Sequence, residues 1–368
     1  MIAALGVPAA ASAAPAATLP TRGLSYVALG DSYAAGYGLT DPTDEPVSGC
    51  GQSAHDYPHQ VAANLGLDLT DVTCAGATTA NVIGTKQLGA APQSNALGRD
   101  TKVVTISIGG NDAGLFATAS SCIALSKTGP IFAHADHSTC KSTLVTGGVD
   151  SLTAAIDGRV TSDLAKAFAT ISRRAPDAHV FVIGYPAIFP DKAHMPPSGC
   201  FRPVVDAETF TGIFPKNGFP FTDTDVAYLG GVQKELDAAT RKAADHAGFT
   251  YVSTLASSEA HSGCATSDSY IQGITLTGTT GLRSISLKPG ALHPNARGAA
   301  FLAAQTAAAI TASYASPSTS TPGPTAQSGH IEVLWIGVVA ALVVLFVILA
   351  TLSRGRRRRL RRQQQQQR

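Results

Sequence analysis

The chain has 368 residues, of which 27 are lysine or arginine and 25 are aspartate or glutamate; only 14% are charged, whereas about 25% is typical of soluble domains. Eight of the arginines lie in the last fifteen residues, so the rest of the chain is net acidic, which argues against a nucleic-acid-binding protein. The length would allow roughly two domains, but α/β domains of this size commonly hold one core, and 44% hydrophobic residues can supply it.

The first twenty residues are apolar and rich in alanine, and they contain the small-residue pattern Ala11-Ser12-Ala13. This composition is typical of the end of a secretory signal peptide with an A-x-A cleavage site. The basic start of such a peptide is missing, so we expect Met1 to lie inside a longer leader. A disordered alanine-rich tail is the alternative. We therefore exclude residues 1–20 from the fold and assign the folded domain to residues 21–315.

Short β-branched and aromatic runs bounded by glycine or proline predict strands at residues 24–29, 103–108, 179–184 and 249–254, with a weaker strand at 67–74. Apolar residues at steps of three and four predict one helix over residues 152–171, which ends before Pro176, and another over residues 226–243. Nearly continuous apolar strands that alternate with helices predict a parallel sheet covered on both faces. The expected fold is a three-layer α/β/α sandwich with a five-stranded parallel sheet.

Four short motifs follow the predicted strands or precede the last helix. They are candidate site residues because parallel sheets of this kind bind ligands beyond the carboxyl ends of their strands. Ser32, in a Gly-Asp-Ser-Tyr turn after the first strand, is the candidate nucleophile. Gly76 follows the weak second strand, where its backbone N–H can face an oxyanion, and Asn111 follows the third strand after two glycines. His293 precedes the final helix and can act as a general base. Each motif alone is weak, since such strings are most often only turns.

Six cysteines are present without a C-x-x-C pair, so zinc-knuckle and thioredoxin-type sites find no support. An even count in a secreted chain favours disulfides. Six cysteines allow fifteen connectivities, and the residues alone do not choose between them, although sequential pairing closes the shortest loops. Six buried free thiols in a cytosolic protein are the alternative.

Taken together and in order, the four motifs resemble the SGNH hydrolases, also called GDSL esterases and lipases, which carry a Ser, a Gly, an Asn and a His in this sequence. The resemblance covers roughly residues 24–312. It is closest to the disulfide-bonded esterases and lipases secreted by actinobacteria, through YVALGDSYAAG at the first motif, CAGATT at the second and a similar layout of cysteines. It implies a flavodoxin-like fold and the disulfides Cys50–Cys74, Cys122–Cys140 and Cys200–Cys264.

The resemblance also implies a mechanism. Ser32 would attack an ester carbonyl while His293 removes its proton, and water would then hydrolyse the acyl-enzyme. The backbone N–H groups of Ser32 and Gly76 and the side-chain amide of Asn111 would form the oxyanion hole. Neither a cofactor nor a metal is expected. The expected partner is an acyl ester, from a lipid or a small molecule, and the catalytic domain is expected to be monomeric.

One position departs from the family pattern. Many members carry an aspartate three residues before the histidine, where this chain has Gly290. Some secreted relatives use a backbone carbonyl there, which would make a Ser-His dyad whose imidazolium is stabilised less than by a carboxylate. The nearest acids upstream are Asp268 and Glu259, and residues 269–292 contain none, so we expect a dyad.

The remaining histidines lack metal-ligand spacing and are interpreted as surface or packing residues, including the H-x-x-H pair His134 and His137. Asp31 and Asp112 flank the candidate residues and are expected to hydrogen-bond the backbone of their turns, with a general-acid role as the alternative. A phosphoester hydrolase with Asp31 as nucleophile would need Mg²⁺ ligands, and no acidic cluster follows the strands to supply them.

Six of the thirteen phenylalanines lie between residues 189 and 221, in a proline-rich connection after the fourth strand. They either form a wall for an acyl chain or pack as a small core beneath the Cys200 loop, since apolar pockets and apolar clusters share their composition. We therefore expect the substrate to be an ester of a lipid or of a simple acid. A carbohydrate acetylesterase, which would cleave sugar acetates, is the alternative.

The C-terminal part predicts a membrane anchor. Residues 316–332 are rich in proline, serine and threonine, which is typical of a linker. The uncharged apolar run at 333–352, at about 1.5 Å per residue, would cross the ~30 Å core of a bilayer as a helix. The arginines of residues 353–368 follow at once, so the positive-inside rule predicts a cytoplasmic tail and an extracellular catalytic domain in the cell membrane. A non-catalytic surface-binding protein is the alternative, and it would leave Ser32 dispensable.

Overall fold

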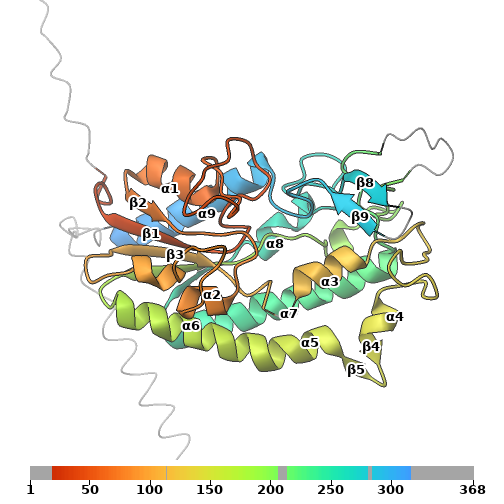
Figure 1. Ribbon diagram of the computed structural model, residues 1–368, viewed down its shortest axis with the longest axis horizontal. Helices are drawn as coiled ribbons and strands as arrows, with labels where there is room; N and C mark the ends of the chain where they lie inside the picture. The colour runs from red at the N-terminus through yellow and green to blue at the C-terminus, as the bar shows by residue number, and fades with distance from the viewer. Residues whose placement is uncertain (1–18, 113, 206–213, 281–283, 316–368) are drawn as a thin grey trace, which may run out of the picture. The chain divides into compact units, whose positions relative to one another are not determined.

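The computed structural model describes residues 19–112, 114–205, 214–280 and 284–315. Its main sheet has five parallel strands in the order β2-β1-β3-β6-β7, as predicted (Figure 1). These strands are β1 (Ser25–Gly30), β2 (Asp68–Asp71), β3 (Val103–Ser107), β6 (His179–Ile183) and β7 (Thr250–Val252). The edge strands β2 and β7 are shorter than predicted, because each pairs along one side only and β2 has no fully buried residue.

Helices connect and cover these strands. The α-helices are α1 (Tyr57–Leu65), α2 (Thr79–Ile83), α3 (Leu115–Ser121), α4 (Lys141–Leu144), α5 (Ser151–Ala155), α6 (Thr161–Arg174), α7 (Asp223–Ala247), α8 (Leu255–Ser258) and α9 (Ala296–Tyr314). The helix predicted over residues 152–171 is α5 and α6 joined by one π-helical turn, η2 (Ile156–Val160). The Thr161 hydroxyl donates to the Ile156 carbonyl at 2.8 Å, a contact that widens the helix at this turn.

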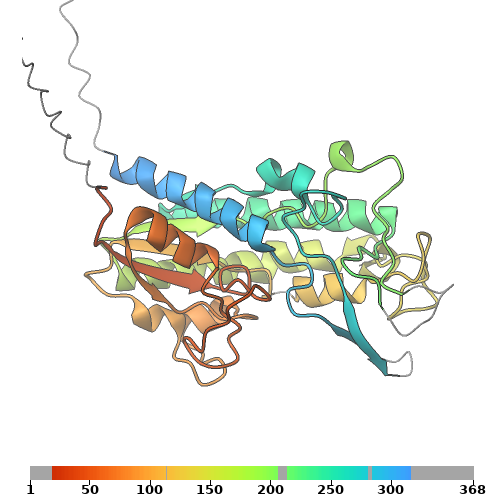
Figure 2. The ribbon, with the colours of Figure 1, turned by 90° about the horizontal axis from the view of Figure 1, so that it is seen from above.

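Two hydrophobic cores cover the two faces of the sheet. Successive residues of a strand point to opposite faces, so Val27 and Leu29 of β1 join the core beneath α2, α6 and α7, whereas Tyr26 and Ala28 join the core beneath α1 and α9. Figures 1 and 2 show α1 and α9 together on one face, and α6 and α7 together on the other. The predicted three-layer α/β/α sandwich is therefore confirmed.

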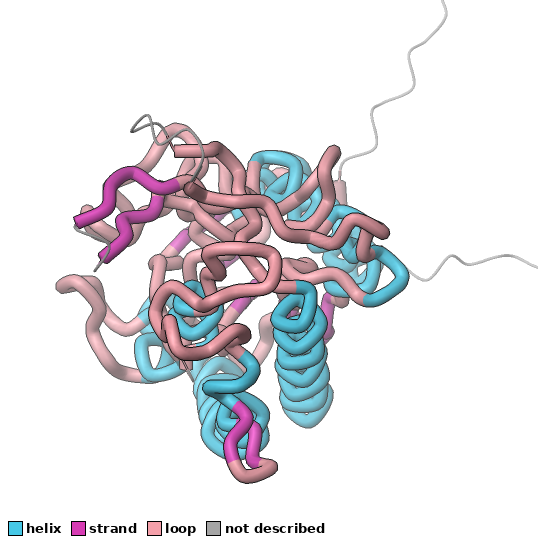
Figure 3. The backbone as a smooth tube through the Cα atoms, turned by 90° about the vertical axis from the view of Figure 1, so that its right-hand side faces the viewer, coloured by secondary structure: helices cyan, strands magenta, loops and turns pink. Residues whose placement is uncertain are grey.

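The chain reverses its direction across the sheet beside β1. From β1 it passes to β2 on one side, and it then returns to β3 on the other side. Such a switch point, at the carboxyl ends of the strands, is where open α/β sheets bind ligands. Loops and two hairpins gather at one end of the domain (Figure 3). The hairpins, which the sequence did not predict, are β4 (Val145–Thr146) with β5 (Val149–Asp150) and β8 (Leu276–Thr280) with β9 (Ser284–Leu287).

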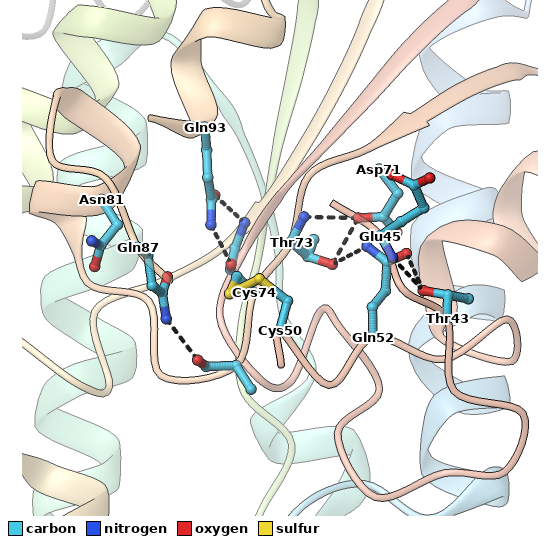
Figure 4. The surroundings of a disulfide bond; sticks show 12 residues. Thr43, Glu45, Cys50, Gln52, Asp71, Thr73, Cys74, Asn81, Gln87 and Gln93 are labelled. Atoms are coloured by element: carbon cyan, nitrogen blue, oxygen red, sulfur yellow. Dashed lines mark hydrogen bonds between the residues drawn. A yellow bond between two sulfur atoms is a disulfide. The ribbon is translucent and has the colours of Figure 1, made fainter. Parts of the chain in front are cut away.

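Three disulfides join the cysteines in the sequential order that the resemblance implied: Cys50–Cys74, Cys122–Cys140 and Cys200–Cys264. The first links the long loop after β1 to the loop after β2 (Figure 4). The Ala75 N–H also donates to the Cys50 carbonyl at 2.8 Å. The two loops that carry Ser32 and Gly76 are thus fastened to each other.

Several sequence predictions concern segments outside the described residues. They are most of the signal-like segment 1–20, the linker 316–332, the apolar run 333–352 and the tail 353–368. Within the part of the chain that the structure describes, none of the helices combines the length and apolar character needed to span a membrane. The membrane anchor therefore stays a prediction.

Candidate active site

A tight turn after β1 presents Ser32. Gly30 ends the strand with φ +143°, and a Cβ there would lie 2.6 Å from the Ser107 carbonyl oxygen, so only glycine fits. The Gln93 side-chain amide bonds both backbone groups of Gly30, at 2.8 and 2.9 Å (Figure 4). Asp31 then accepts a hydrogen bond from the Tyr33 N–H at 3.0 Å, which closes the turn. The strand end and the turn together fix where the serine side chain points.

His293 lies against this serine although the two residues are 261 positions apart. Its Nε2 is 2.7 Å from the Ser32 Oγ, and its Nδ1 is 2.8 Å from the Ala291 carbonyl oxygen. A carbonyl only accepts hydrogen bonds, so Nδ1 carries the proton and the lone pair of Nε2 faces the serine hydroxyl. This is the tautomer that a general base for Ser32 requires.

Aromatic rings surround the imidazole of His293. The rings of Tyr33, Tyr37 and Phe116 have centroids 5.0, 5.4 and 5.5 Å from it. Burial among these groups lowers the pKa of His293 to about 4, against the smaller opposing effect of the hydrogen bond to the Ala291 carbonyl. The imidazole is therefore neutral at pH 7 and able to accept a proton.

Gly290, where the family pattern places an aspartate, has a backbone that leaves no room for a side chain. Its φ is +87°, and a Cβ would lie 2.9 Å from the Gln272 amide nitrogen and 3.1 Å from the Cα of Gly38. Gly38 belongs to the loop after Ser32, so the histidine loop and the serine loop meet backbone to backbone. A side chain at this position would therefore be strained in the loop as it is folded.

The two upstream acids have other partners. Asp268 pairs with Arg297, while Glu259 accepts a hydrogen bond from the Asp191 N–H at 2.6 Å and lies 3.9 Å from Lys234. Within the described ranges, no carboxylate hydrogen-bonds the imidazole of His293. The structure thus contains the dyad-like arrangement that the sequence predicted, with the Ala291 carbonyl in the place of the acid.

The three predicted oxyanion donors come from adjoining loops. The Asn111 Nδ2 donates to the Ala77 carbonyl at 3.0 Å, which ties the loop after β3 to the loop of Gly76. Gly76 has φ +80°, and the Gln87 side chain holds the preceding Ala75 carbonyl at 2.7 Å (Figure 4). In the described structure, the backbone N–H groups of Ser32 and Gly76 donate no hydrogen bond, and Asn111 retains a second amide hydrogen. These donors are available to an oxyanion.

Asp31 hydrogen-bonds the backbone of its own turn, as expected, whereas Asp112 bonds the start of α2 and not its own turn. Both oxygens of the fully buried Asp31 are engaged, one by the Tyr33 N–H and the other by the Tyr185 hydroxyl at 2.5 Å. Burial raises the pKa of Asp31 to about 7. Asp112 accepts a hydrogen bond from the Thr79 N–H at 3.1 Å. Asp31 is therefore poorly placed to act as the nucleophile of a phosphoester hydrolase.

Comparison with known proteins agrees with this geometry. Residues 28–301 match the model of the GDSL-like lipase/acylhydrolase family. Lipase 2 of Streptomyces coelicolor is 37% identical over 299 residues, which cover 81% of this chain and 89% of that protein. The chain belongs to the GDSL-like lipase/acylhydrolase family. The prediction of a carboxylic ester hydrolase of this type is confirmed.

Solved structures confirm the fold of this GDSL hydrolase. A phospholipase A1 from Streptomyces albidoflavus is 23% identical and superimposes with a TM-score of 0.55, covering 78% of this chain and 99% of that one. An extracellular lipase from Streptomyces rimosus, 22% identical, has the same TM-score and the same coverage of both chains. At these identities the likeness concerns the fold alone.

An apolar pocket opens beside the candidate dyad of the GDSL hydrolase. Its cavity volume is about 60 Å³. Leu115, Phe116, Ile188, Phe189, Leu229 and Val232 are among the residues that line it. Phe116 also stacks on the His293 ring, with an interplanar angle of 23°. Phe116 therefore connects the pocket to the candidate base, although His293 and Ser32 are not among the lining residues.

The phenylalanines of residues 189–221 divide between the two roles considered for them. Phe189 lines the pocket, whereas Phe219 and Phe221 are fully buried behind it with centroids 5.6 and 5.1 Å from the Phe189 ring. Phe201 and Phe214 are half-buried against the same core. Phe210 lies outside the described residues. The segment is thus mainly a small core that supports one wall of the pocket.

Three residues that shape the site were not singled out from the sequence. The Tyr33 hydroxyl donates to the Leu292 carbonyl at 2.5 Å, which joins the serine turn to the histidine loop. The Tyr185 hydroxyl accepts from the Gly110 N–H at 3.0 Å and donates to Asp31, which joins β1 to β3. Phe116 links the pocket to His293. Tyr33 could have been found from its place beside Ser32, but Tyr185 and Phe116 carry no local signal.

Proposed function

We propose that the chain is a cell-surface serine esterase or lipase that cleaves carboxylic esters through an acyl-enzyme on Ser32, with His293 as the general base. The observation that carries this proposal is the 2.7 Å contact between the Ser32 Oγ and the His293 Nε2, together with the Ala291 carbonyl on Nδ1. A nucleophile bonded to a base that is itself oriented by a third group is the arrangement needed to activate a weak hydroxyl.

In the proposed mechanism, the Ser32 Oγ attacks the ester carbonyl carbon while its proton passes to the His293 Nε2. The oxyanion so formed accepts hydrogen bonds from the Ser32 N–H, the Gly76 N–H and the Asn111 amide. The imidazolium then returns the proton to the leaving alcohol as the C–O bond breaks. A water molecule, deprotonated by His293, attacks the acyl-enzyme, and the acid is released as Ser32 regains its proton.

The apolar pocket supports esters with an aliphatic acyl chain as substrates. Among the pocket residues, Tyr185 and Gln233 carry the polar side chains. Tyr185 already bonds Asp31 and the Gly110 N–H, and Gln233 accepts from the Ile188 N–H, so the Gln233 Nε2 is the one buried donor of these two side chains without a partner in the described structure. A sugar ring would need several free hydrogen-bonding groups, whereas an acyl chain needs only apolar surface. A carbohydrate acetylesterase, in which only an acetyl group enters this pocket, is the second candidate.

The proposed place of action is the outer face of the cell membrane. It is supported by the apolar run at 333–352 and the arginines that follow it. We expect protease added to intact cells to release the catalytic domain by cleavage in residues 316–332, while a tag placed after residue 368 stays protected. Protection of the catalytic domain would contradict this orientation.

The proposed mechanism is tested by covalent labelling of the full chain. An organophosphate should modify wild-type protein at Ser32 and abolish hydrolysis of p-nitrophenyl esters, because it traps the activated hydroxyl. The variant Ser32→Ala should take up no label and should lose activity by orders of magnitude while keeping its thermal unfolding temperature. Full activity in Ser32→Ala would refute the mechanism.

The substrate class is tested by narrowing the pocket. Ala119, on α3, lines it one turn along from Phe116. We expect Ala119→Phe to lower kcat/KM for a dodecanoyl ester while leaving kcat/KM for an acetyl ester near the wild-type value, so the acetyl ester serves as the internal control. Equal loss for both esters, or a wild-type preference for acetyl esters of sugars, would favour the carbohydrate acetylesterase.

A further inference from the structure

A second cluster of ionisable side chains lies apart from Ser32, where α1 packs against β2. Asp56 caps the start of α1, its Oδ1 accepting from the His59 N–H at 2.8 Å, and Asp71 ends β2. One ligand atom from each of Asp56, His59 and Asp71 lies within 4.8 Å of the others. His59 was expected to be a surface or packing residue because the sequence shows no metal-ligand spacing around it.

The two carboxylates are buried and only half satisfied. The side chain of Asp56 is 0% exposed and that of Asp71 is 4% exposed. Asp71 Oδ1 accepts from the Thr73 N–H at 2.9 Å and the Thr73 hydroxyl at 2.7 Å (Figure 4), but its Oδ2 has no hydrogen-bond partner. Asp56 Oδ2 also has none. A buried carboxylate oxygen without a partner is costly, so these two oxygens point to a missing ligand.

The unpartnered oxygen of Asp71 faces the imidazole. Asp71 Oδ2 lies 3.6 Å from the His59 Nδ1, which also lies 2.8 Å from Asp56 Oδ1. In the described part of the chain, neither carboxylate pairs with a lysine or an arginine. The cluster thus places two buried carboxyl groups beside one half-buried imidazole.

We propose that Asp56, His59 and Asp71 bind a zinc ion. Two carboxylate oxygens and one imidazole nitrogen suit zinc, whereas calcium and magnesium favour oxygen ligands alone. Ligand atoms around tetrahedral zinc are about 3.4 Å apart at bond lengths of about 2.0 to 2.2 Å, close to the 3.6 Å between Asp71 Oδ2 and His59 Nδ1. Binding replaces the proton on Nδ1, which leaves to solvent, and breaks the Asp56–His59 hydrogen bond.

An ion can reach this site from solvent. The imidazole side chain is 34% exposed, and a surface hollow lined by Glu45, Gln52, His59, Leu69 and Asp71 opens onto it. Water from the hollow supplies the fourth ligand of the zinc. The alternative occupant is a proton held between the two carboxyl groups, which would satisfy both free oxygens without a metal.

The proposed zinc ion would act on the fold and not on the substrate, because its ligands support the loop that carries Ser32 from behind. A Cβ at Gly36, in that loop, would lie 2.8 Å from the Cβ of Asp56, so the loop packs directly on the cluster. Asp71 pairs in register with Ala28 of β1, and Ala28 lies three residues before Asp31 in the chain. The ion would therefore tie together the start of α1, the end of β2 and the loop after β1, without touching the substrate.

The test uses the full chain stripped of metal with a chelator and titrated with zinc chloride by calorimetry. We expect binding of one zinc ion per chain, release of protons seen as a dependence of the heat on buffer, a raised unfolding temperature, and unchanged esterase activity. His59→Ala and Asp71→Asn should each weaken binding by more than about tenfold.

A matched control exists in the cluster of Asp191, His194 and Glu259, which offers similar groups. In the described structure neither Asp191 nor Glu259 has a buried oxygen without a hydrogen-bond partner, and Lys234 lies 3.9 Å from Glu259, so we expect His194→Ala to bind zinc like wild type. Lack of stoichiometric zinc in the wild-type chain would overturn the proposal in favour of the shared proton. Binding that survives His59→Ala and is lost in His194→Ala would overturn it as well, and neither result depends on the role of Ser32.

Discussion

His293 and His59 each hold Nδ1 2.8 Å from an oxygen atom, but that oxygen is the Ala291 backbone carbonyl in one case and the Asp56 carboxylate in the other. The environments differ as much as the partners. Aromatic rings surround His293 and burial lowers its pKa, whereas the carboxylates beside His59 raise its pKa. One imidazole is kept neutral, and the other is set to hold a positive charge or a cation.

This difference shows that a histidine–carboxylate contact alone does not identify a catalytic base. A search for the acid and the histidine of a triad would select Asp56 and His59, which have no serine bonded to them among the described residues. The histidine that contacts Ser32 has no carboxylate. What distinguishes His293 is the partner of its second ring nitrogen, which is the hydroxyl of a serine held in a tight turn.

The largest expected effect separates the two histidines directly. We expect His293→Ala to lower kcat by roughly 10⁴-fold or more, because Ser32 loses its base, while His59→Ala leaves kcat within a few fold of wild type. Steady-state kinetics on a p-nitrophenyl ester measure both, with circular dichroism as the control for folding. An equal loss of kcat in the two variants would contradict the assignment of His293, and not His59, as the base.

The pH dependence of kcat/KM should reflect the lowered pKa of His293. Its neutral form is the base, so activity should persist as the pH falls below 6.5 and decline only near pH 4. With a histidine of unperturbed pKa as the base, kcat/KM at pH 5 would already be about 30-fold below its maximum. Between pH 6.5 and 4, His293 is protonated in the unfolded chain but not in the folded chain, so the free energy of unfolding decreases as the pH is lowered. Folding must therefore be checked at each pH. An acid limb centred near pH 6.5 would contradict the proposed environment.

Tyr33→Phe should produce a smaller loss. The variant removes the hydroxyl that bonds the Leu292 carbonyl and so loosens the histidine loop, although it keeps the ring beside His293. We expect kcat to fall by about 5- to 10-fold with KM little changed, as for a buried hydrogen bond worth about 1 to 1.5 kcal/mol. Tyr57→Phe, which removes another buried hydroxyl that contacts Ser107 and not the histidine loop, is the matched control. A purely structural role for Tyr33 would lower the unfolding temperature and leave kcat unchanged.

The smallest expected effect concerns the absent acid. Asp268→Asn and Glu259→Gln should keep kcat within a few fold of wild type, because neither carboxylate contacts His293 and the Ala291 carbonyl sets its tautomer. The loss of a true triad carboxylate can cost about 10⁴ in kcat. If a folded Asp268→Asn variant fell to the level of His293→Ala, the backbone carbonyl would not be the orienting group.

The sequence predicted the elements of the sheet and the order of the site residues well. Strand identity follows from short β-branched runs, and the positions of Ser32, Gly76 and Asn111 follow from the strand ends they adjoin. The helix over residues 152–171 was predicted from its periodicity, but its π-helical turn, where the Thr161 hydroxyl bonds the Ile156 carbonyl, leaves no periodic signal. Both hairpins were missed because their strands are short and lie apart from the main sheet.

By itself, then, the sequence determined the α/β/α sandwich, the strand ends that carry Ser32 and Asn111, and the absence of an aspartate at Gly290, since periodicity and turn composition are properties of neighbouring residues. Only the tertiary structure decided that the Ala291 carbonyl bonds His293, that Gly38 packs on Gly290 and that Asp71 meets His59. Each of these contacts joins backbone or side-chain atoms whose meeting depends on the exact path of a loop or on the packing of one element against another. Such contacts follow from three-dimensional packing and cannot be read from local patterns.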